Sequence, residues 1–361
     1  MSSYIEPLAT ALTVAKNAEN HVAFKIIFMP CENAVMTGAS ALSEAYLSDN
    51  TELFFLGKSS SSKVSLTSGG FEEFSISDKL SRTSPTYDKA YRITMEGAAS
   101  QPLAIRQQSL PNPIKQLGSL LANFKSTSFL FELSSFSGGS NAVLTPSKAS
   151  VTLVINSADE EKFISKMDKA IEKFNEKYQD AFPDISYTYE EVDVPEKVLT
   201  KKETENIISL LYTAPSGVYY KDDDGNILAV TNIGKISTKN SKLSIKACIM
   251  SCSADILDEL HDSYQTIAGL CNVKIHSVNE YGIFSGGGAS AALLSGFEEA
   301  FISYTDDSKM IVEDAFETTA CNVFYEKNSS MAMLYCGISD KTKEKFAGSL
   351  ITYLDKTSLL N

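Results

Sequence analysis

Few residues of this chain have side chains that commonly do metal or nucleophilic chemistry. The 361 residues include three histidines, His21, His261 and His276, which are far apart in the sequence. None of them stands at a known ligand spacing from a second histidine, a cysteine or a carboxylate, and His261-Asp262 is predicted to lie on a helix surface. Metallohydrolases and enzymes with Cys–His or Ser–His–Asp sites each need a well-placed imidazole. The sequence therefore offers little material for these classes of enzyme.

Three other features resemble ligand sites only weakly. Gly286-Gly287-Gly288 lacks the Lys and Ser/Thr of a phosphate-binding loop and is interpreted as a flexible loop between domains. The acidic stretch 222–226 lacks the twelfth-position carboxylate of an EF-hand loop and is predicted to be a hairpin turn. Glu32 follows the apolar run 21–29, at the strand end where sites of α/β folds gather. Alone, a carboxylate there is more often a helix cap or a surface group.

The composition is typical of an acidic globular protein with more than one domain. The length suits two domains at roughly 100–200 residues each, and 43% of the residues are hydrophobic. Forty-five acidic against 32 basic residues give a net charge of −13, which disfavours binding to nucleic acid or to anionic membranes. No apolar stretch approaches the ~18–20 residues that span a bilayer, and the first residues do not resemble a secretory signal. The six scattered cysteines are therefore expected to be reduced, mostly buried thiols of a cytoplasmic protein.

Strand and helix patterns alternate along the chain. Apolar runs predict strands over 21–29, 50–56 and 89–97, and apolar residues at helical spacing predict a helix over 114–124. Strands are also predicted over 151–155, 186–194, 242–250 and 273–277, and helices over 160–182 and 254–270. The end of the chain, over 289–304, 331–336 and 342–360, again alternates helix and strand. The middle of the chain thus forms an α+β module, and its end completes the sheet begun by the first hundred residues.

In this order of segments, the chain resembles the M20 family of zinc peptidases, most closely its aminoacyl-histidine dipeptidase branch. Residues 26–39 (IIFMPCENAVMTGA) are similar to the family's strand and its Asp-Glu-Glu-Thr-Gly turn, and residues 90–97 to the strand that leads into Gly-Gly-His-Ser-Gly. Residues 136–140, and segments between 198 and 234, are similar to the lid of that branch. The resemblance covers nearly the whole chain and identifies it as a degenerate homologue shortened at its N-terminus.

The resemblance implies an α/β fold in which one domain interrupts another. Residues 1–97 and 290–361 would form a truncated catalytic-type α/β domain, and residues 98–289 an α+β lid domain. In the family the lid makes the dimer interface. The missing N-terminal strands would leave a sheet edge or a helix face exposed, and exposed edges invite pairing with other chains.

The family's chemistry needs two zinc ions held by histidines and carboxylates, with a glutamate as general base. The resemblance places the base at Glu32. The metal-ligand positions, in contrast, fall on residues that bind zinc poorly or not at all: Ser3, Asn33, Gly57, and Gln101 or Pro102. The last ligand should lie near residues 338–343, which contain no histidine. The sequence therefore predicts neither a metal nor another cofactor.

These substitutions predict a catalytically inactive peptidase-like protein, a pseudoenzyme that acts through protein–protein interactions. Such a chain would be a structural or scaffold subunit of a dimer or a larger assembly. The alternative is a metal-free binder of peptides or small molecules, with Glu32, Asn33 and Gln101 lining the old cleft. Residual dipeptidase activity is the least favoured hypothesis.

Overall fold

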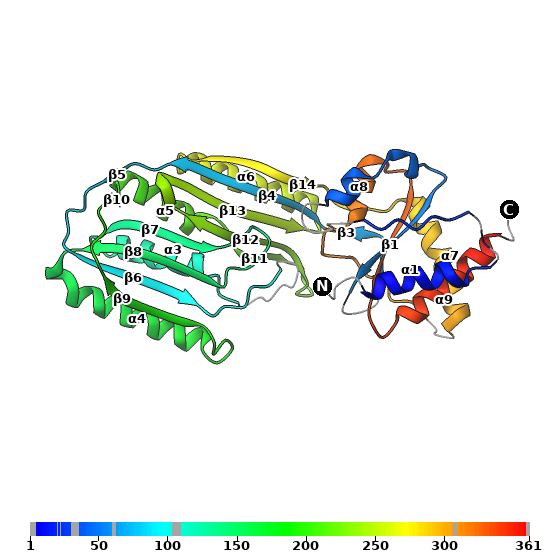
Figure 1. Cartoon of the computed structure of the whole chain (residues 1–361), viewed down its shortest axis with the longest axis horizontal. Coiled ribbons are helices and arrows are strands. Elements are labelled where there is room, and N and C mark those ends of the chain that lie inside the picture. The colour runs from blue at the N-terminus through cyan, green and yellow to red at the C-terminus, as the bar shows by residue number, and fades with distance from the viewer. Residues whose placement is uncertain are drawn as a thin grey trace. The chain divides into compact units, whose positions relative to one another are not determined.

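The computed structural model describes residues 5–19, 21, 23–29, 36–59, 63–102, 110–305 and 309–358. The chain divides into two compact units (Figure 1). The discontinuous unit combines Met1–Gly70 with Tyr281–Asn361, and the inserted unit is Phe71–Glu280. In the sequence, one unit thus interrupts the other. The observed boundaries differ from those predicted, because residues 71–97 carry strands of the inserted unit's sheet and residues 281–289 return to the discontinuous unit.

The discontinuous unit is built on a three-stranded sheet in the order β1-β16-β2. Its strands are β1 (Glu52–Lys58), β16 (Ala332–Ile338), which is parallel to β1, and β2 (Lys63–Ser65), which is antiparallel to β16. A two-stranded ribbon joins β3 (Thr67–Ser68) to β15 (Phe284–Ser285). The helices are α1 (Ile5–Asn17), α2 (Thr37–Ala41), α7 (Gly288–Thr305), α8 (Ala320–Lys327) and α9 (Lys343–Ser358), with a 3-10 turn at Glu44–Tyr46.

The aromatic side chains on one side of this sheet form the unit's core. Phe54 of β1 packs edge-on against Phe297 of α7 and Tyr353 of α9, with ring centroids 5.3 and 5.4 Å apart. On the other side of the sheet, Phe55 stacks on Tyr335 of β16. Because both sides carry packed aromatic rings, β1 has an uninterrupted apolar run rather than an alternating pattern, as strands of parallel sheets usually do.

The prediction of a strand over residues 21–29 is wrong for the described part of that segment. Residues 21 and 23–29 carry no strand. Phe24 packs against the core of the unit, whereas Ile27 and Phe28 are 41% and 60% exposed. An apolar run indicates a tendency to form a strand, but a strand also needs a neighbour with which to pair.

The inserted unit contains a nine-stranded sheet with helices packed against it (Figure 1). The strand order is β14-β4-β13-β12-β7-β8-β6-β9, and β11 pairs separately with β12. The strands are β4 (Gly70–Lys79), β6 (Lys89–Glu96), β7 (Glu132–Gly139), β8 (Lys148–Ile155), β9 (Ser186–Val192), β11 (Gly217–Lys221), β12 (Ile227–Ser237), β13 (Lys242–Ser251) and β14 (Lys274–Tyr281). A small ribbon pairs β5 (Arg82–Thr83) with β10 (Val198–Leu199).

The helices of this unit are α3 (Pro113–Ser126), α4 (Glu160–Tyr178), α5 (Lys201–Thr213) and α6 (Ala254–Leu270). Helices α3, α4 and α6 begin within one residue of the starts predicted from the sequence. Asn112, Thr200 and Ser253 each accept a hydrogen bond from a backbone N–H of the first turn, which satisfies a donor that the helix itself leaves unpaired. The helices cover a large core of aliphatic and aromatic side chains from the sheet. Among the described residues, no helix is long and apolar enough to cross a membrane.

Candidate functional site

Of the site residues predicted from the sequence, half lie in the described part of the chain. Ser3, Glu32 and Asn33 are outside the described residues. Gly57 belongs to the discontinuous unit, and Gln101 and Pro102 belong to the inserted unit. The contacts of these last three residues show what each position does.

Gly57 fills a position where the structure leaves no room for a side chain. It is buried in β1 and pairs with Gly337 of β16. A Cβ atom added to Gly57 would lie 2.5 Å from Cε2 of Tyr335, closer than non-bonded carbons approach. Tyr335 is itself buried, and its hydroxyl donates a hydrogen bond to Glu317. Packing thus explains a glycine at the position where the resemblance expects an aspartate ligand.

Gln101 and Pro102 take part in a short antiparallel bridge. The N–H of Gln101 donates to Oγ1 of Thr145 at 2.9 Å, and its carbonyl accepts from the N–H of Thr145 at 2.9 Å. Pro102 bridges to Leu144. These backbone contacts hold the segment in an extended conformation, and neither side chain carries an imidazole or a carboxylate.

The position expected for the last ligand is occupied by a surface ion pair. Asp340 and Lys343, at the start of α9, are 2.7 Å apart. The hydrogen bond from Lys343 lowers the pKa of the exposed Asp340 carboxyl. An exposed aspartate already paired with a lysine one turn away is a common helix-start arrangement.

The described residues at the expected ligand positions do not fit a pair of zinc ions. Glycine and proline supply no side-chain donor, and a glutamine amide is a weak, neutral ligand compared with histidine or carboxylate. In the part of the chain that the structure describes, no group of three or more His, Cys, Asp or Glu side chains could hold a metal ion.

The structure reveals a polar cluster around the buried Glu72 in the inserted unit, which the sequence analysis missed. Glu72 of β4 is 3% exposed, and its carboxylate lies 2.9 Å from Nδ1 of His261 on α6. The hydroxyl of Ser277 on β14 donates a hydrogen bond to the same carboxylate. The three residues thus join β4, α6 and β14 at one end of the nine-stranded sheet.

This cluster has the residue types of a catalytic triad but a different connectivity. In a triad the imidazole lies between hydroxyl and carboxylate, so that it can take the hydroxyl proton. Here the carboxylate lies between the other two, and the hydroxyl of Ser277 points its proton at Glu72 rather than at His261. The hydrogen bond with Glu72 raises the pKa of His261. The arrangement stabilises a buried charge and does not activate a nucleophile.

Lys115 is a buried amine, which is a group that some enzymes use as a nucleophile. Burial lowers the pKa of Lys115 to about 8. Its Nζ donates hydrogen bonds to the carbonyls of Leu211 at 2.5 Å, Ala214 at 2.6 Å and Tyr212 at 3.2 Å. These carbonyls lie at the end of α5, where a helix leaves its last acceptors unpaired. Lys115 is therefore a helix cap.

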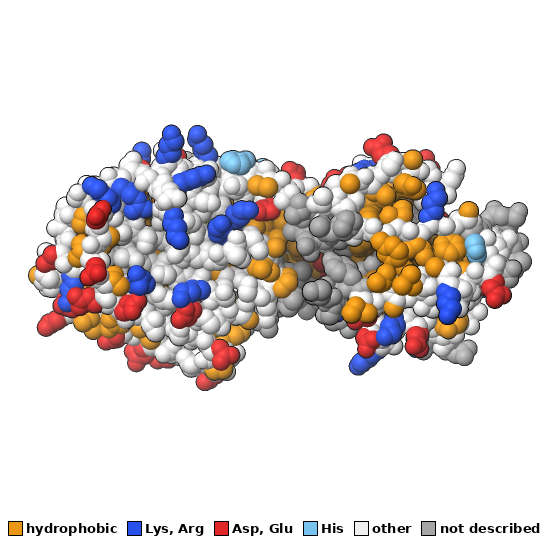
Figure 2. Space-filling model, viewed as in Figure 1, with side chains coloured by type: hydrophobic (Ala, Val, Ile, Leu, Met, Phe, Trp, Pro, Cys, Tyr) orange, Lys and Arg blue, Asp and Glu red, His pale blue; other side chains and the backbone are white. Residues whose placement is uncertain are grey.

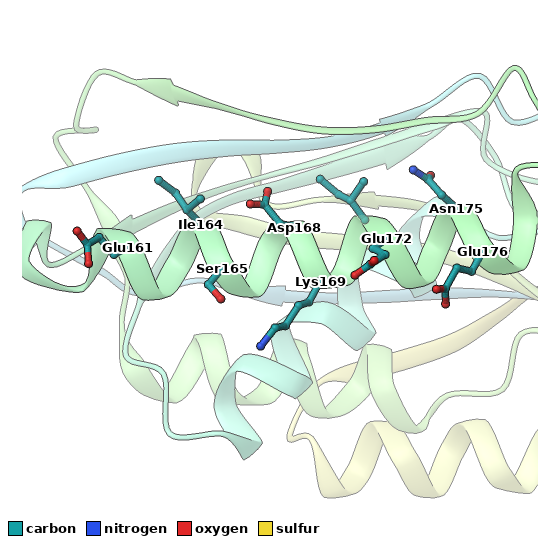
Figure 3. Close-up of a pocket in the computed structure, with 9 residues that line it drawn as sticks. Glu161, Ile164, Ser165, Asp168, Lys169, Glu172, Asn175 and Glu176 are labelled. Atoms are coloured by element: carbon teal, nitrogen blue, oxygen red, sulfur yellow. The ribbon is translucent and has the colours of Figure 1, made fainter.

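The hollow drawn in Figure 3 is an open surface along one helix. All of its lining residues come from α4. Ile164, Asp168 and Asn175 point to one side of the helix, and Ser165 and Lys169 point to another (Figure 3). The Asp168 carboxylate accepts a hydrogen bond from the Tyr189 hydroxyl at 3.0 Å. A site lined by a single helix does not enclose a small molecule.

Comparisons with known proteins identify the fold of the chain. No family model and no curated protein matches the sequence. Among solved structures, an aminoacylhistidine dipeptidase from Vibrio alginolyticus matches with a TM-score of 0.79 at 20% identity, over 97% of this chain and 74% of that chain. The chain has an M20 dipeptidase-like fold.

Two weaker structural similarities are to other peptidases. An aminopeptidase from Bacillus cereus matches with a TM-score of 0.46 at 9% identity, over 97% of this chain and 70% of that chain. A tripeptidase from Staphylococcus aureus matches with a TM-score of 0.43 at 9% identity, over 98% and 70%. The M20 dipeptidase-like fold is the property that this chain shares with the Vibrio alginolyticus structure.

Proposed function

We propose that this chain is a non-catalytic protein of M20 dipeptidase-like fold that acts through contacts with other protein chains. In this role it is a structural or scaffold subunit of a dimer or a larger assembly. It binds no zinc and hydrolyses no dipeptide. The cytoplasmic location and the absence of nucleic-acid and membrane partners, which were inferred from sequence composition, remain predictions.

The packing of Gly57 against Tyr335 is the observation that carries this proposal. An aspartate at position 57 would have to displace a buried aromatic ring, because its Cβ would lie 2.5 Å from that ring. The packing around position 57 thus accommodates a glycine and no larger residue. Gln101 and Pro102 support the same conclusion, since backbone bridging accounts for their positions and neither supplies a ligand for zinc.

The intact inserted unit supports a role in protein contacts. Its core is extensive, and its buried amide Asn232 has its donor and acceptor groups satisfied by Ala142, Leu144 and Asn112. Such satisfied buried polar groups are typical of a stable native fold. A chain that keeps its scaffold while its ligand positions lack ligands is best explained by a function that needs the scaffold.

An activity assay combined with affinity capture tests this proposal. The purified chain, supplied with zinc, is expected to release no histidine from aminoacyl-histidine dipeptides. The tagged chain is expected to retain a defined protein partner from a native extract, or a second copy of itself. Catalytic turnover that is abolished by a chelator would overturn the proposal. A thermal shift with dipeptides, without turnover and without any partner, would instead support a metal-free binder.

A further inference from the structure

Among the described residues, the three-stranded sheet of the discontinuous unit has one edge covered by backbone pairing and one edge that pairs with no further strand. At the β2 edge, the backbone of Val64 bonds to the carbonyl of Ile311 at 2.9 Å and to the N–H of Glu313 at 3.0 Å. At the other edge, β1 pairs with β16 alone among the described strands. Edge strands of natural proteins usually carry inward charges, prolines or bulges that prevent pairing. Between its two end residues, β1 has none of these, and its half-buried run 53–56 is entirely apolar.

The sequence of β1 is complementary to itself in charge. It begins with Glu52 and ends with Lys58. In an antiparallel pair of two such strands centred on Phe55, Glu52 of each copy faces Lys58 of the other. Two-fold symmetry forms this ion pair twice, and opposite charges across a strand pair favour the pairing.

The same register also brings apolar residues of the two copies face to face on each side of the sheet. It sets Phe54 opposite Leu56, and Phe55 opposite its own copy. Residues that face each other in an antiparallel pair lie on the same side of a sheet. Phe54 and Leu56, which pack against the core beneath α7 and α9, would therefore meet their counterparts on that side. The two cores would become continuous across the joint.

Helix α1 adds an apolar surface that borders β1. The helix contacts both β1 and α9. It leaves Ile5, Leu8 and Leu12 exposed by 60%, 43% and 53%, and their spacing puts them on one face of the helix. Figure 2 shows hydrophobic side chains gathered on the face of this unit that carries α1 and β1. Since α1 and α9 lie on one side of the sheet, the two-fold pairing would place both copies of this stripe on that same side.

We propose that two copies of this chain associate by antiparallel pairing of β1, with Glu52 and Lys58 setting the register and α1 extending the interface. The inference rests on the proposed function, because it names the partner and the surface of that role. The partner is a second copy of the chain, and the joint is a continuous six-stranded sheet across a two-fold axis.

A charge-exchange experiment tests the pairing. In Glu52→Lys, lysine faces lysine in both ion pairs, and in Lys58→Glu, glutamate faces glutamate. Each variant alone is expected to dimerise about tenfold more weakly than the wild-type chain, a change equivalent to ~1.4 kcal/mol. An equimolar mixture of the two variants is expected to recover dimers, because every facing pair then has opposite charges. Sedimentation velocity at low and high salt measures the dimer fraction of the wild type, of each variant and of the mixture.

Matched controls separate charge effects at β1 from general ones. Glu299 lies on α7, and Lys309 precedes the segment paired with β2; both are exposed residues of the same unit. Glu299→Lys and Lys309→Glu reverse these two charges. Both are expected to dimerise as the wild type does. Thermal melting of each variant checks folding, because Glu52 accepts a hydrogen bond from Tyr353 at 2.8 Å and Lys58 lies 3.8 Å from Glu6.

The possible outcomes distinguish this inference from the function on which it rests. A dimer that both single variants leave unchanged overturns the inference, because another surface then makes the contact and the proposed function stands. A wild-type chain that stays monomeric overturns it as well, and capture of unlike partners then decides the proposed function. Mixing that fails to restore dimers of two folded variants contradicts the register.

Discussion

At the scale of single residues, the proposed function depends on what occupies each position where the resemblance expects a metal ligand. Gly57 could be identified from the sequence as the wrong residue for a ligand, but the reason for a glycine there could not, because Tyr335 is far away in the sequence and β16 brings it close. The Glu72–His261 contact was missed for a similar reason. The two residues are 189 positions apart, and no local pattern links them.

Restoring the expected ligand at position 57 should destabilise the chain without creating a metal site. Gly57→Asp is expected to lower the free energy of unfolding by about 1–3 kcal/mol, because the new Cβ overlaps the Tyr335 ring. Chemical denaturation measures the change. Gly57→Ala should show a similar loss, and a smaller one when Tyr335→Leu makes room. Equal losses with and without Tyr335→Leu would contradict the packing explanation.

The His261–Glu72 contact should make stability depend on pH. The hydrogen bond with Glu72 is the main cause of the raised pKa of His261, with smaller effects from Asp262 and Glu280. A raised pKa means that the folded chain holds the proton more tightly than the unfolded one. This stabilisation is therefore complete below the unfolded value of about 6.5, and it is lost as the pH rises through the folded value.

Thermal unfolding measured across that pH range checks this prediction. The wild-type melting temperature should fall more steeply as the pH rises than that of His261→Gln. The control His276→Gln changes an exposed histidine of β14 and should keep the wild-type slope. Identical slopes for the wild type and His261→Gln would show that the contact does not contribute.

At the scale of elements, local signals were sufficient where the cause is local. The caps Asn112 and Ser253 lie within a turn of the donors that they satisfy, and the sequence places the starts of α3 and α6 to within one residue. The apolar run 21–29 shows the opposite case. Whether it becomes a strand depends on a neighbouring strand, and periodicity carries no information about neighbours.

Asn322 of α8 connects three segments of the discontinuous unit, and its loss should be costly. Its Oδ1 accepts a hydrogen bond from Ser68 at 2.6 Å, and its Nδ2 donates to the carbonyls of Gly69 at 3.0 Å and Gly282 at 2.7 Å. Asn322→Ala would remove all three of these hydrogen bonds at a buried site and is expected to cost about 2–3 kcal/mol. The exposed Asn17→Ala, at the end of α1, should change stability by less than about 0.5 kcal/mol. Denaturation curves with equal losses would contradict this assignment.

At the scale of the whole molecule, the boundaries between the two units needed the structure. Strand β4 shows why. Its residues follow the last strand of the first unit directly, and only its pairing with β13 and β14 assigns it to the inserted unit. A junction between two units that both contain sheets leaves no clear change in the sequence pattern.

The inserted unit should fold by itself, because its core and its buried polar network are internal. Residues 71–280 expressed alone are expected to unfold in one cooperative transition with native-like near-ultraviolet circular dichroism. Asn232→Ala in this fragment should lower its melting temperature, because the buried Asn232 amide holds the carbonyls of Ala142 and Leu144. A fragment that unfolds without cooperativity would show that it depends on the rest of the chain.

The zinc content of the full-length chain tests the central claim most directly. The chain is dialysed against micromolar zinc, washed free of unbound metal, and analysed by inductively coupled plasma mass spectrometry beside a chelator-treated sample. A non-catalytic chain without a metal site should have the same zinc content in both samples, near zero per chain. About two zinc ions per chain, removed by the chelator, are what a two-metal hydrolase would retain, and that result would overturn the proposed function.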